Sequence, residues 1–324
     1  GVPSITTTRN GYSYIAFNSI GLQNGNSVPP FPNSLNKIYV GKLDFSGNLN
    51  WIKQNINFND KNIKLYSGDK NNNYDTIHGR LQESNKNNDT YLDLSHLELI
   101  NINNLFNDKL YNNIQFLFLN NNNLTGTIDL SKFINLISID VAHNSISRII
   151  VNKNLKELVI NNNSMTELPT NINLIRLECS YNNILDIPRY SNLELLQCSN
   201  NLITHLQDYP KLRKIIISNN PLKELDVSPQ VIYLDISQTT LKNLENFPFL
   251  EHLVANYSKI TSVPNITTIH TLELINTPVS RIQFFPIIET ILCSVHLTKH
   301  ISSKYSNCYN INLRNNSIIC ISKL

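Results

Sequence analysis

Residues able to do covalent chemistry are present in this chain, but their spacing fits no known catalytic pattern. The sequence contains no G-x-S-x-G, H-E-x-x-H, P-loop or G-x-G-x-x-G motif. With nine glycines in 324 residues, loops that cradle a phosphate are hard to build. The eight histidines are scattered, and none has an obvious carboxylate and nucleophile around it. The sequence therefore predicts a protein that is not an enzyme and that uses no cofactor.

Metal-binding patterns are equally weak. The five cysteines form no C-x-x-C pair and no His/Cys cluster at zinc spacing, and only Cys308 and Cys320 are placed so that they could pair. The segment Asp69–Asp75 imitates the first half of a calcium loop. However, Tyr74 stands where that loop needs glycine, and the twelfth position is Arg80 instead of glutamate. We expect no metal site, and mostly reduced thiols favour an intracellular setting.

Composition and charge exclude further classes of protein. The net charge is only +3 and charged residues make up 16% of the chain, which argues against a nucleic-acid binder. No apolar run is long enough for a membrane span. Asparagine accounts for about 54 residues, an excess that together with abundant isoleucine is typical of an AT-rich genome, such as that of a large DNA virus, a protist or a low-GC bacterium. We expect an intracellular or particle-associated protein, and secretion stays open.

Asparagine and aliphatic residues alternate at fixed offsets, which indicates a repeat. The pattern L-x-x-L-x-L-x-x-N-x-L opens at eleven aliphatic or cysteine residues, which are Ile114, Leu136, Leu155, Leu174, Leu193, Leu212, Val231, Leu250, Ile269, Ile288 and Cys308. The interval is 19 residues from Leu155 to Ile288. A weaker copy lies upstream at Leu92, Leu94 and Leu99. Residues 87–324 thus hold about twelve units.

These positions resemble the leucine-rich repeat family. Units such as Cys179–Asn183 and Cys198–Asn201 are similar to the short repeats of bacterial effectors and large DNA viruses. The resemblance implies a mainly β solenoid, or horseshoe, with a parallel concave sheet and no regular helices. It also implies a non-enzymatic module that binds another protein on the concave face. Two alternatives remain open, a structural component of a larger assembly such as a virus particle and a secreted adhesion protein.

The spacing itself predicts how each unit folds. The L-x-L alternation places two aliphatic residues on the inner face of a short strand, which pairs in parallel with its neighbours. The chain then returns to the start of the next unit, and we expect this return segment to be extended or 3₁₀ with almost no α-helix. A further aliphatic residue, three positions after the eleventh position of the repeat, anchors the return segment. This residue recurs at Ile149, Leu168, Ile187, Leu206, Leu225, Leu244, Val263 and Ile282. The ninth-position asparagines should form a buried ladder that satisfies backbone groups.

The two ends of the chain do not follow the repeat. Residues 1–86 are predicted to form a small β-rich module, with a hairpin at Ile38–Ile52 and polar linkers at Asp69–Asn73 and Glu83–Asp89. This module is either a cap on the first repeat or a separate recognition module. At the other end, the last strand is expected to be an open edge through which the protein could assemble.

The concave face carries the candidate binding residues. They are the outward-pointing residues on either side of the inward strand aliphatics, with charges of both signs and several exposed aromatic or aliphatic side chains. The partner would be a protein of unknown identity. The candidates are Tyr91, Phe116, Phe118, Glu157, Arg176, Glu178, Leu195, Lys214, Ile216, Tyr233, Asp235 and His252.

Overall fold

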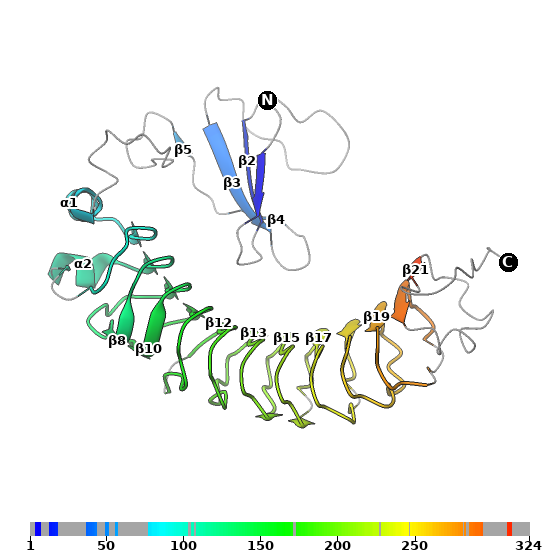
Figure 1. Ribbon diagram of the computed structural model, residues 1–324. Coiled ribbons are helices and arrows are strands. Elements are labelled where there is room, and N and C mark those ends of the chain that lie inside the picture. Colours follow the sequence, from blue (N-terminus) through cyan, green and yellow to red (C-terminus); the bar gives the residue numbers. More distant parts are fainter. Residues whose placement is uncertain are drawn as a thin grey trace. The chain divides into compact units, whose positions relative to one another are not determined.

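The chain divides into two compact units, Gly1–Asn72 and Asn73–Leu324 (Figure 1). The structure is a computed structural model. It describes residues 4–7, 13–18, 37–43, 49–51, 56–57, 77–102, 105–106, 108–170, 173–226, 228–245, 247–280, 282, 285–293 and 310–312.

The first unit contains an antiparallel sheet. Its strands are β1 (Ser4–Thr7), β2 (Ser13–Asn18), β3 (Lys37–Leu43), β4 (Leu49–Trp51) and β5 (Ile56–Asn57), in the order β1-β2-β3-β4 with β5 also on β3. The predicted hairpin is confirmed, because β3 and β4 pair antiparallel with Leu43 opposite Leu49.

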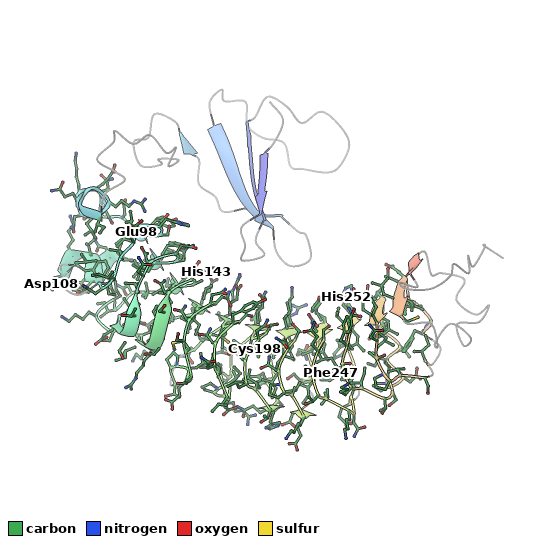
Figure 2. All side chains as sticks on the ribbon, in the orientation of Figure 1. Glu98, Asp108, His143, Cys198, Phe247 and His252 are labelled. Atoms are coloured by element: carbon green, nitrogen blue, oxygen red, sulfur yellow. The ribbon has the colours of Figure 1, made fainter. Side chains whose placement is uncertain are left out.

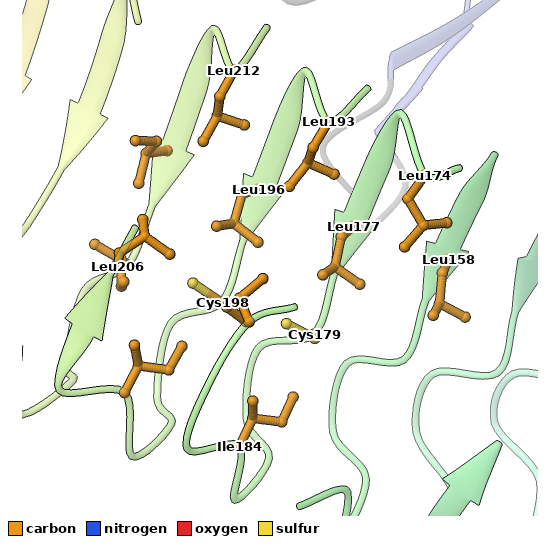
Figure 3. Packing of buried hydrophobic residues seen from close by; sticks show 14 of the residues in the cluster. Leu158, Leu174, Leu177, Cys179, Ile184, Leu193, Leu196, Cys198, Leu206 and Leu212 are labelled. Carbon is orange, nitrogen blue, oxygen red and sulfur yellow. The ribbon is translucent and has the colours of Figure 1, made fainter. Parts of the chain in front are cut away.

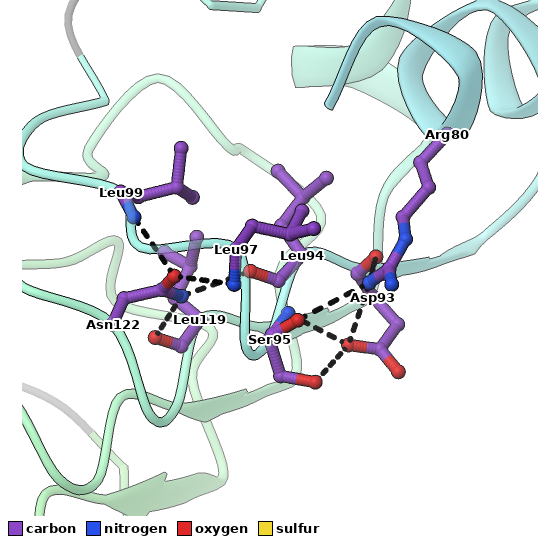
Figure 4. Close-up of polar contacts among 8 residues, drawn as sticks. All are labelled: Arg80, Asp93, Leu94, Ser95, Leu97, Leu99, Leu119 and Asn122. Carbon is purple, nitrogen blue, oxygen red and sulfur yellow. Dashed lines mark hydrogen bonds and ion pairs between the residues drawn. The ribbon is translucent and has the colours of Figure 1, made fainter. Parts of the chain in front are cut away.

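The first described element of the second unit is a helix, and here the expected linker was wrong. The residues from Glu83 to Asn87 belong to α1 (Ile77–Asn87). Ile77 and Leu81, one turn apart, both pack against the core of the second unit. The Arg80 guanidinium donates to the carbonyl of Asp93 at 3.0 Å on the first repeat strand (Figure 4). The division between the units therefore lies after Asn72, ahead of the expected boundary at residue 86.

Twelve parallel strands form one sheet, as the repeat predicts. Neighbours along the chain are neighbours in the sheet. The strands are β6 (Tyr91–Asp93), β7 (Phe116–Phe118), β9 (Ser138–Asp140), β11 (Glu157–Val159), β12 (Arg176–Glu178), β13 (Leu195–Gln197), β15 (Lys214–Ile216), β17 (Tyr233–Asp235), β18 (His252–Val254), β19 (Thr271–Leu274), β20 (Thr290–Cys293) and β21 (Asn310–Asn312).

The core runs as columns of equivalent residues through the stack. Leu158, Leu177, Leu196 and Ile215 are fully buried and directly opposite one another in register. Cys179 and Cys198 lie in the next inward column as free, buried thiols, as expected (Figure 3). Each unit leaves an apolar face that its neighbour covers, so the stack makes one continuous core.

The return segments are extended where the structure describes them beyond the first units. Two short parallel ladders lie there, β8 (Thr125–Asp129) with β10 (Ser145–Ile150) and β14 (His205–Leu206) with β16 (Glu224–Leu225). The predicted anchor column is buried from Ile149 to Val263. One short helix, α2 (Asp108–Asn113), departs from the expectation, because β6 and β7 are separated by a longer connection than the later strands.

A second buried column on the return side was not predicted. It lies three residues before the opening aliphatic of a unit and holds the largest fully buried side chains, which are Phe133, Tyr190, Tyr209, Phe247 and Phe285. The tyrosine hydroxyls find backbone acceptors, with Tyr190 donating to the carbonyl of Pro169 at 2.7 Å and Tyr209 to that of Ile187 at 2.8 Å. These rings fill the space between successive returns.

The asparagine ladder is present as predicted. The Asn201 amide nitrogen donates to the carbonyls of Cys179 at 2.9 Å and Cys198 at 3.0 Å, while its oxygen accepts the Ile184 N–H at 3.0 Å. Asn122 makes the same kind of bonds in the first repeats (Figure 4). Each of these asparagines thus ties its own turn to the preceding one.

The residue before each ladder position adopts a left-handed backbone. Positive φ angles of 53° to 59° occur in this column at Asn121, His143, Asn162, Tyr181, Asn200, Asn219, Gln238, Tyr257 and Asn276. Asparagine tolerates this conformation better than most side chains. The repeated Asn-Asn doublets therefore have a structural cause, since the first residue makes the turn and the second makes the ladder.

Candidate functional site

The candidate site is the face of the twelve-stranded sheet that lies on the inner, concave side of the second unit (Figure 1). Because each strand places one inward aliphatic between two outward residues, the outward residues form two columns along this face. The register aligns the members of each column across neighbouring strands, for example Lys214 with Tyr233 and Tyr233 with His252. The predicted site residues therefore do share one face.

The first aromatic cluster lies on β6 and β7. Tyr91 and Phe116 are opposite one another in register, and both are exposed, at 51% and 37%. The ring of Phe118 lies 4.9 Å from that of Tyr91. Three aromatic side chains thus lie on two adjacent strands.

The middle of the face is polar and more enclosed. Arg176 and Glu178, on the same strand, form an ion pair in which both side chains are buried. Burial lowers the pKa of Arg176, against the opposing effect of Glu178. The Glu157 carboxylate accepts from the Ser138 hydroxyl at 3.2 Å. Arg176 and Glu178 are held by each other and Glu157 is held by Ser138, which leaves less of these side chains for a partner.

The expected exposure of Leu195 was wrong. Its exposed fraction is 4%. In register it lies between Arg176 and Lys214 on the two flanking strands. The hydrocarbon stems of such long side chains can cover an apolar neighbour. A sequence offset locates Leu195 on the face but does not show what stands beside it.

The second aromatic cluster spans β15, β17 and β18. The Lys214 ammonium lies over the Tyr233 ring at 4.8 Å from its centre, and the ring of His252 lies 6.0 Å further along. Ile216 and Val254 occupy the second column of the same strands and are half-buried. His252 points to the concave side (Figure 2). Burial lowers the pKa of His252, and the neighbouring His270 adds to that effect.

The two aromatic clusters are distinct. Five inter-strand steps separate β7 from β15, which corresponds to roughly 24 Å at the usual strand spacing. A partner that touches both clusters must therefore be extended or large, since the polar centre of the face lies between them.

Just beyond the strands, a column of small polar side chains, Ser180, Ser199 and Ser218, has a structural role. The Ser180 hydroxyl accepts the Ser199 N–H at 3.1 Å, and Asn161 accepts the Ser180 N–H at 2.7 Å. Further along, Ser199 and Ser218 share a hydrogen bond of 2.8 Å. These side chains satisfy the backbone at the strand ends and are not predicted to select a ligand.

Several acidic residues of the face also have a local structural bond. Asp140 and Asp235 each accept the N–H two residues further on, at 2.9 Å. The Asn256 amide donates to the Glu273 carboxylate at 2.7 Å, and Asn161 makes the equivalent bond to Glu178 at 3.2 Å. Sequence reasoning missed these bonds, although the Asn-to-Glu spacing of 17 residues repeats in both pairs.

The described residues show no group of three or more His, Cys, Asp and Glu placed to hold a metal ion. Burial raises the pKa of the Cys198 thiol well above its usual value and that of Cys293 to about 11, so neither is a thiolate near pH 7. In the part of the chain that the structure describes, no helix is long and apolar enough to cross a membrane.

Some predictions lie outside the described residues. These are the calcium-like segment Asp69–Asp75, the cysteines Cys308 and Cys320, the open edge expected after the last strand, residues 313–324, and the ninth position of the unit that opens at Ile288, where His296 stands in place of asparagine.

Comparisons with known proteins agree with this geometry. No family model matches the chain, and no curated protein matches it. Solved structures do match, and those named below are leucine-rich repeat proteins. YopM from Yersinia enterocolitica WA-314 is 20% identical with a TM-score of 0.58, over 72% of this chain and 57% of that one. The leucine-rich repeat domain of APL1B is 17% identical with a TM-score of 0.62, over 74% and 79%.

The functional domain of InlJ from Listeria monocytogenes, which includes a cysteine ladder, is 19% identical with a TM-score of 0.53, over 71% of this chain and 64% of that domain. The chain thus spans less than two thirds of YopM and of the InlJ domain. At such identities the likeness concerns the fold. The parallel sheet, the asparagine ladder and these neighbours together identify the second unit as a leucine-rich repeat solenoid.

Proposed function

We propose that this chain is a non-enzymatic interaction module that binds a protein partner on its concave face. The observation that carries the proposal is the pair of aromatic clusters, Tyr91 with Phe116 and Phe118, and Tyr233 with His252. Aromatic side chains dominate the energetics of protein interfaces, where a few residues supply most of the binding free energy. A sheet face that needed only solubility would not gain from them.

The polar centre of the face supports the same role. The Ser138 hydroxyl fixes Glu157, and the Arg176–Glu178 pair lies on the adjacent strand, so a partner would meet a preorganised surface. Preorganised side chains cost little entropy on binding. One solved neighbour was determined as part of a complex between two proteins, LRIM1 and APL1C; the match covers 60% of this chain at 25% identity and a TM-score of 0.50.

The test is a pull-down from the native source of the protein. The bait is the wild type or a triple variant, Phe116→Ala, Phe118→Ala and Tyr233→Ala. The control is Tyr181→Asn with Tyr257→Asn, which removes two exposed aromatics outside the strands and keeps residues suited to the left-handed backbone there. We expect the control to recover the partner and the triple variant to lose it. Equal recovery by both variants would refute binding through the concave face.

A further inference from the structure

The strands that follow β15 on the concave face carry charges of one sign. Strands β17 to β20, together with the residue before each strand, carry the carboxylates Asp235, Glu251, Glu273 and Glu289, and no Lys or Arg. His252 and His270 are the other titratable side chains of this group besides Tyr233 and Cys293. The whole chain is nevertheless positive, at +3. The excess of positive charge therefore lies elsewhere on the molecule.

These carboxylates act on the aromatic cluster itself. Burial, and after it the negative charges of Asp235 and Glu273, raise the pKa of Tyr233 to about 12. Glu251 and Glu289 favour the protonated form of His252, although burial outweighs them. Because all four charges reach the two rings, they also act on any group that a partner places over those rings.

The chain itself already places one cation, the Lys214 ammonium, against this aromatic cluster. On β15 the Lys214 ammonium lies over the Tyr233 ring, on the strand adjacent to Asp235. An ammonium over an aromatic face beside a carboxylate is a favourable arrangement. The next strands repeat the ring and the carboxylate, as His252 and Glu273, but their sequence supplies no cation.

We propose that the partner meets β17–β20 with a basic segment, rich in Lys or Arg and carrying at least one apolar anchor. This inference rests on the proposed function and names the chemistry of the partner at that site. The anchor contacts Tyr233 and Val254, and the cations face Asp235, Glu251 and Glu273. Charge complementarity of this kind raises association rates and selects against acidic partners.

The test selects peptides instead of assuming one. A display library of random 12-residue peptides is panned against the full-length chain at low salt, and the enriched peptides are synthesised. We expect enrichment in Lys and Arg together with an apolar residue. Binding is then measured by fluorescence anisotropy against two charge variants. The first is Asp235→Asn with Glu273→Gln, which keeps the acceptors for Ser237 and Asn256.

The second variant is the control, Glu167→Gln with Glu224→Gln, which removes two exposed carboxylates at equivalent positions outside the concave strands. We expect the first variant to bind about fivefold more weakly and to lose part of its salt dependence, and the control to match the wild type. Enriched peptides that are neutral or acidic, no enrichment at all, or equal weakening by both variants would overturn the inference.

The two proposals fail in different ways. If acidic or neutral peptides bind wild type but not Tyr233→Ala, the concave face binds partners and only the basic chemistry is wrong. If basic peptides bind wild type and Tyr233→Ala equally, both proposals fail at this cluster. Thermal unfolding followed by circular dichroism shows whether each variant keeps its fold.

Discussion

Replacement of a single ladder residue, Asn201→Ala, tests the physical account of the stack most directly. Asn201 is buried, and its side chain makes bonds to both its own turn and the preceding one. Alanine keeps the backbone and removes every one of those bonds. The loss of stability can be worked out bond by bond, because some of the backbone groups that bond to Asn201 have a second hydrogen-bond partner and others do not.

The two carbonyl oxygens that accept from Asn201 each keep another hydrogen-bond donor in the variant. The Cys179 carbonyl also accepts from Asn182 at 3.0 Å, and the Cys198 carbonyl also accepts from Asn220 at 2.9 Å. The Ile184 N–H, in contrast, loses the acceptor that Asn201 provided at 3.0 Å. A buried donor left without a partner costs about 1–3 kcal/mol, so we expect Asn201→Ala to lower the free energy of unfolding by about 2 kcal/mol.

Urea unfolding followed by circular dichroism measures the change, with Asn183→Ala as a control at an exposed asparagine of the adjacent turn. The control should change the free energy of unfolding by less than about 0.5 kcal/mol. Amide hydrogen exchange at Ile184 should accelerate in Asn201→Ala alone. If the two variants unfold at the same urea concentration, the ladder contributes nothing specific and the reasoning is refuted.

Three other residues give predictions of their own. Ser258 occupies a ladder position, and its buried hydroxyl has no hydrogen-bond partner among the described groups, so Ser258→Asn should raise the free energy of unfolding by about 1 kcal/mol in urea titrations. Tyr209→Phe removes the hydrogen bond to the Ile187 carbonyl and should lower the free energy of unfolding by about 1 kcal/mol. A melting temperature equal to that of the wild type would contradict this. Burial lowers the pKa of His252, so the unfolded chain binds more protons as the pH falls below about 6.5, and stability decreases there. His252→Gln should make the difference in the free energy of unfolding between pH 7.5 and pH 5.0 smaller. An unchanged difference in urea titrations at the two pH values would contradict the role of His252.

Much of the solenoid could be predicted because its causes are local and repeated. The inward columns follow from strand alternation, and every predicted register has its strand, down to β21. The Asn182 and Asn201 bonds follow from a turn that must satisfy backbone groups. These features depend only on the unit itself and on its neighbour, which has the same pattern of residues, so the sequence of one unit is enough to predict them.

The remaining features depend on contacts that one unit does not reveal. The aromatic column of Tyr190 and Tyr209 fills space between returns, and its positions also hold Asn152 and Ser228, which blurs the pattern. The burial of Leu195 depends on which long side chains flank it in the sheet. Helix α1 has little hydrophobic periodicity beyond Ile77 and Leu81, so its polar residues suggested a linker.

The ladder changes character along the stack. Up to Asn220 its side chains bridge one coil to the next, whereas the hydroxyls of Thr239 and Thr277 bond to carbonyls of their own coil, those of Ile236 and Leu274. Under a stretching load, the ladder column itself should resist less at Thr239 than at Asn220, because the Thr239 hydroxyl bonds within its own coil. Thr239 lies in the same unit as Tyr233, so this weaker point of the column falls beside the second aromatic cluster.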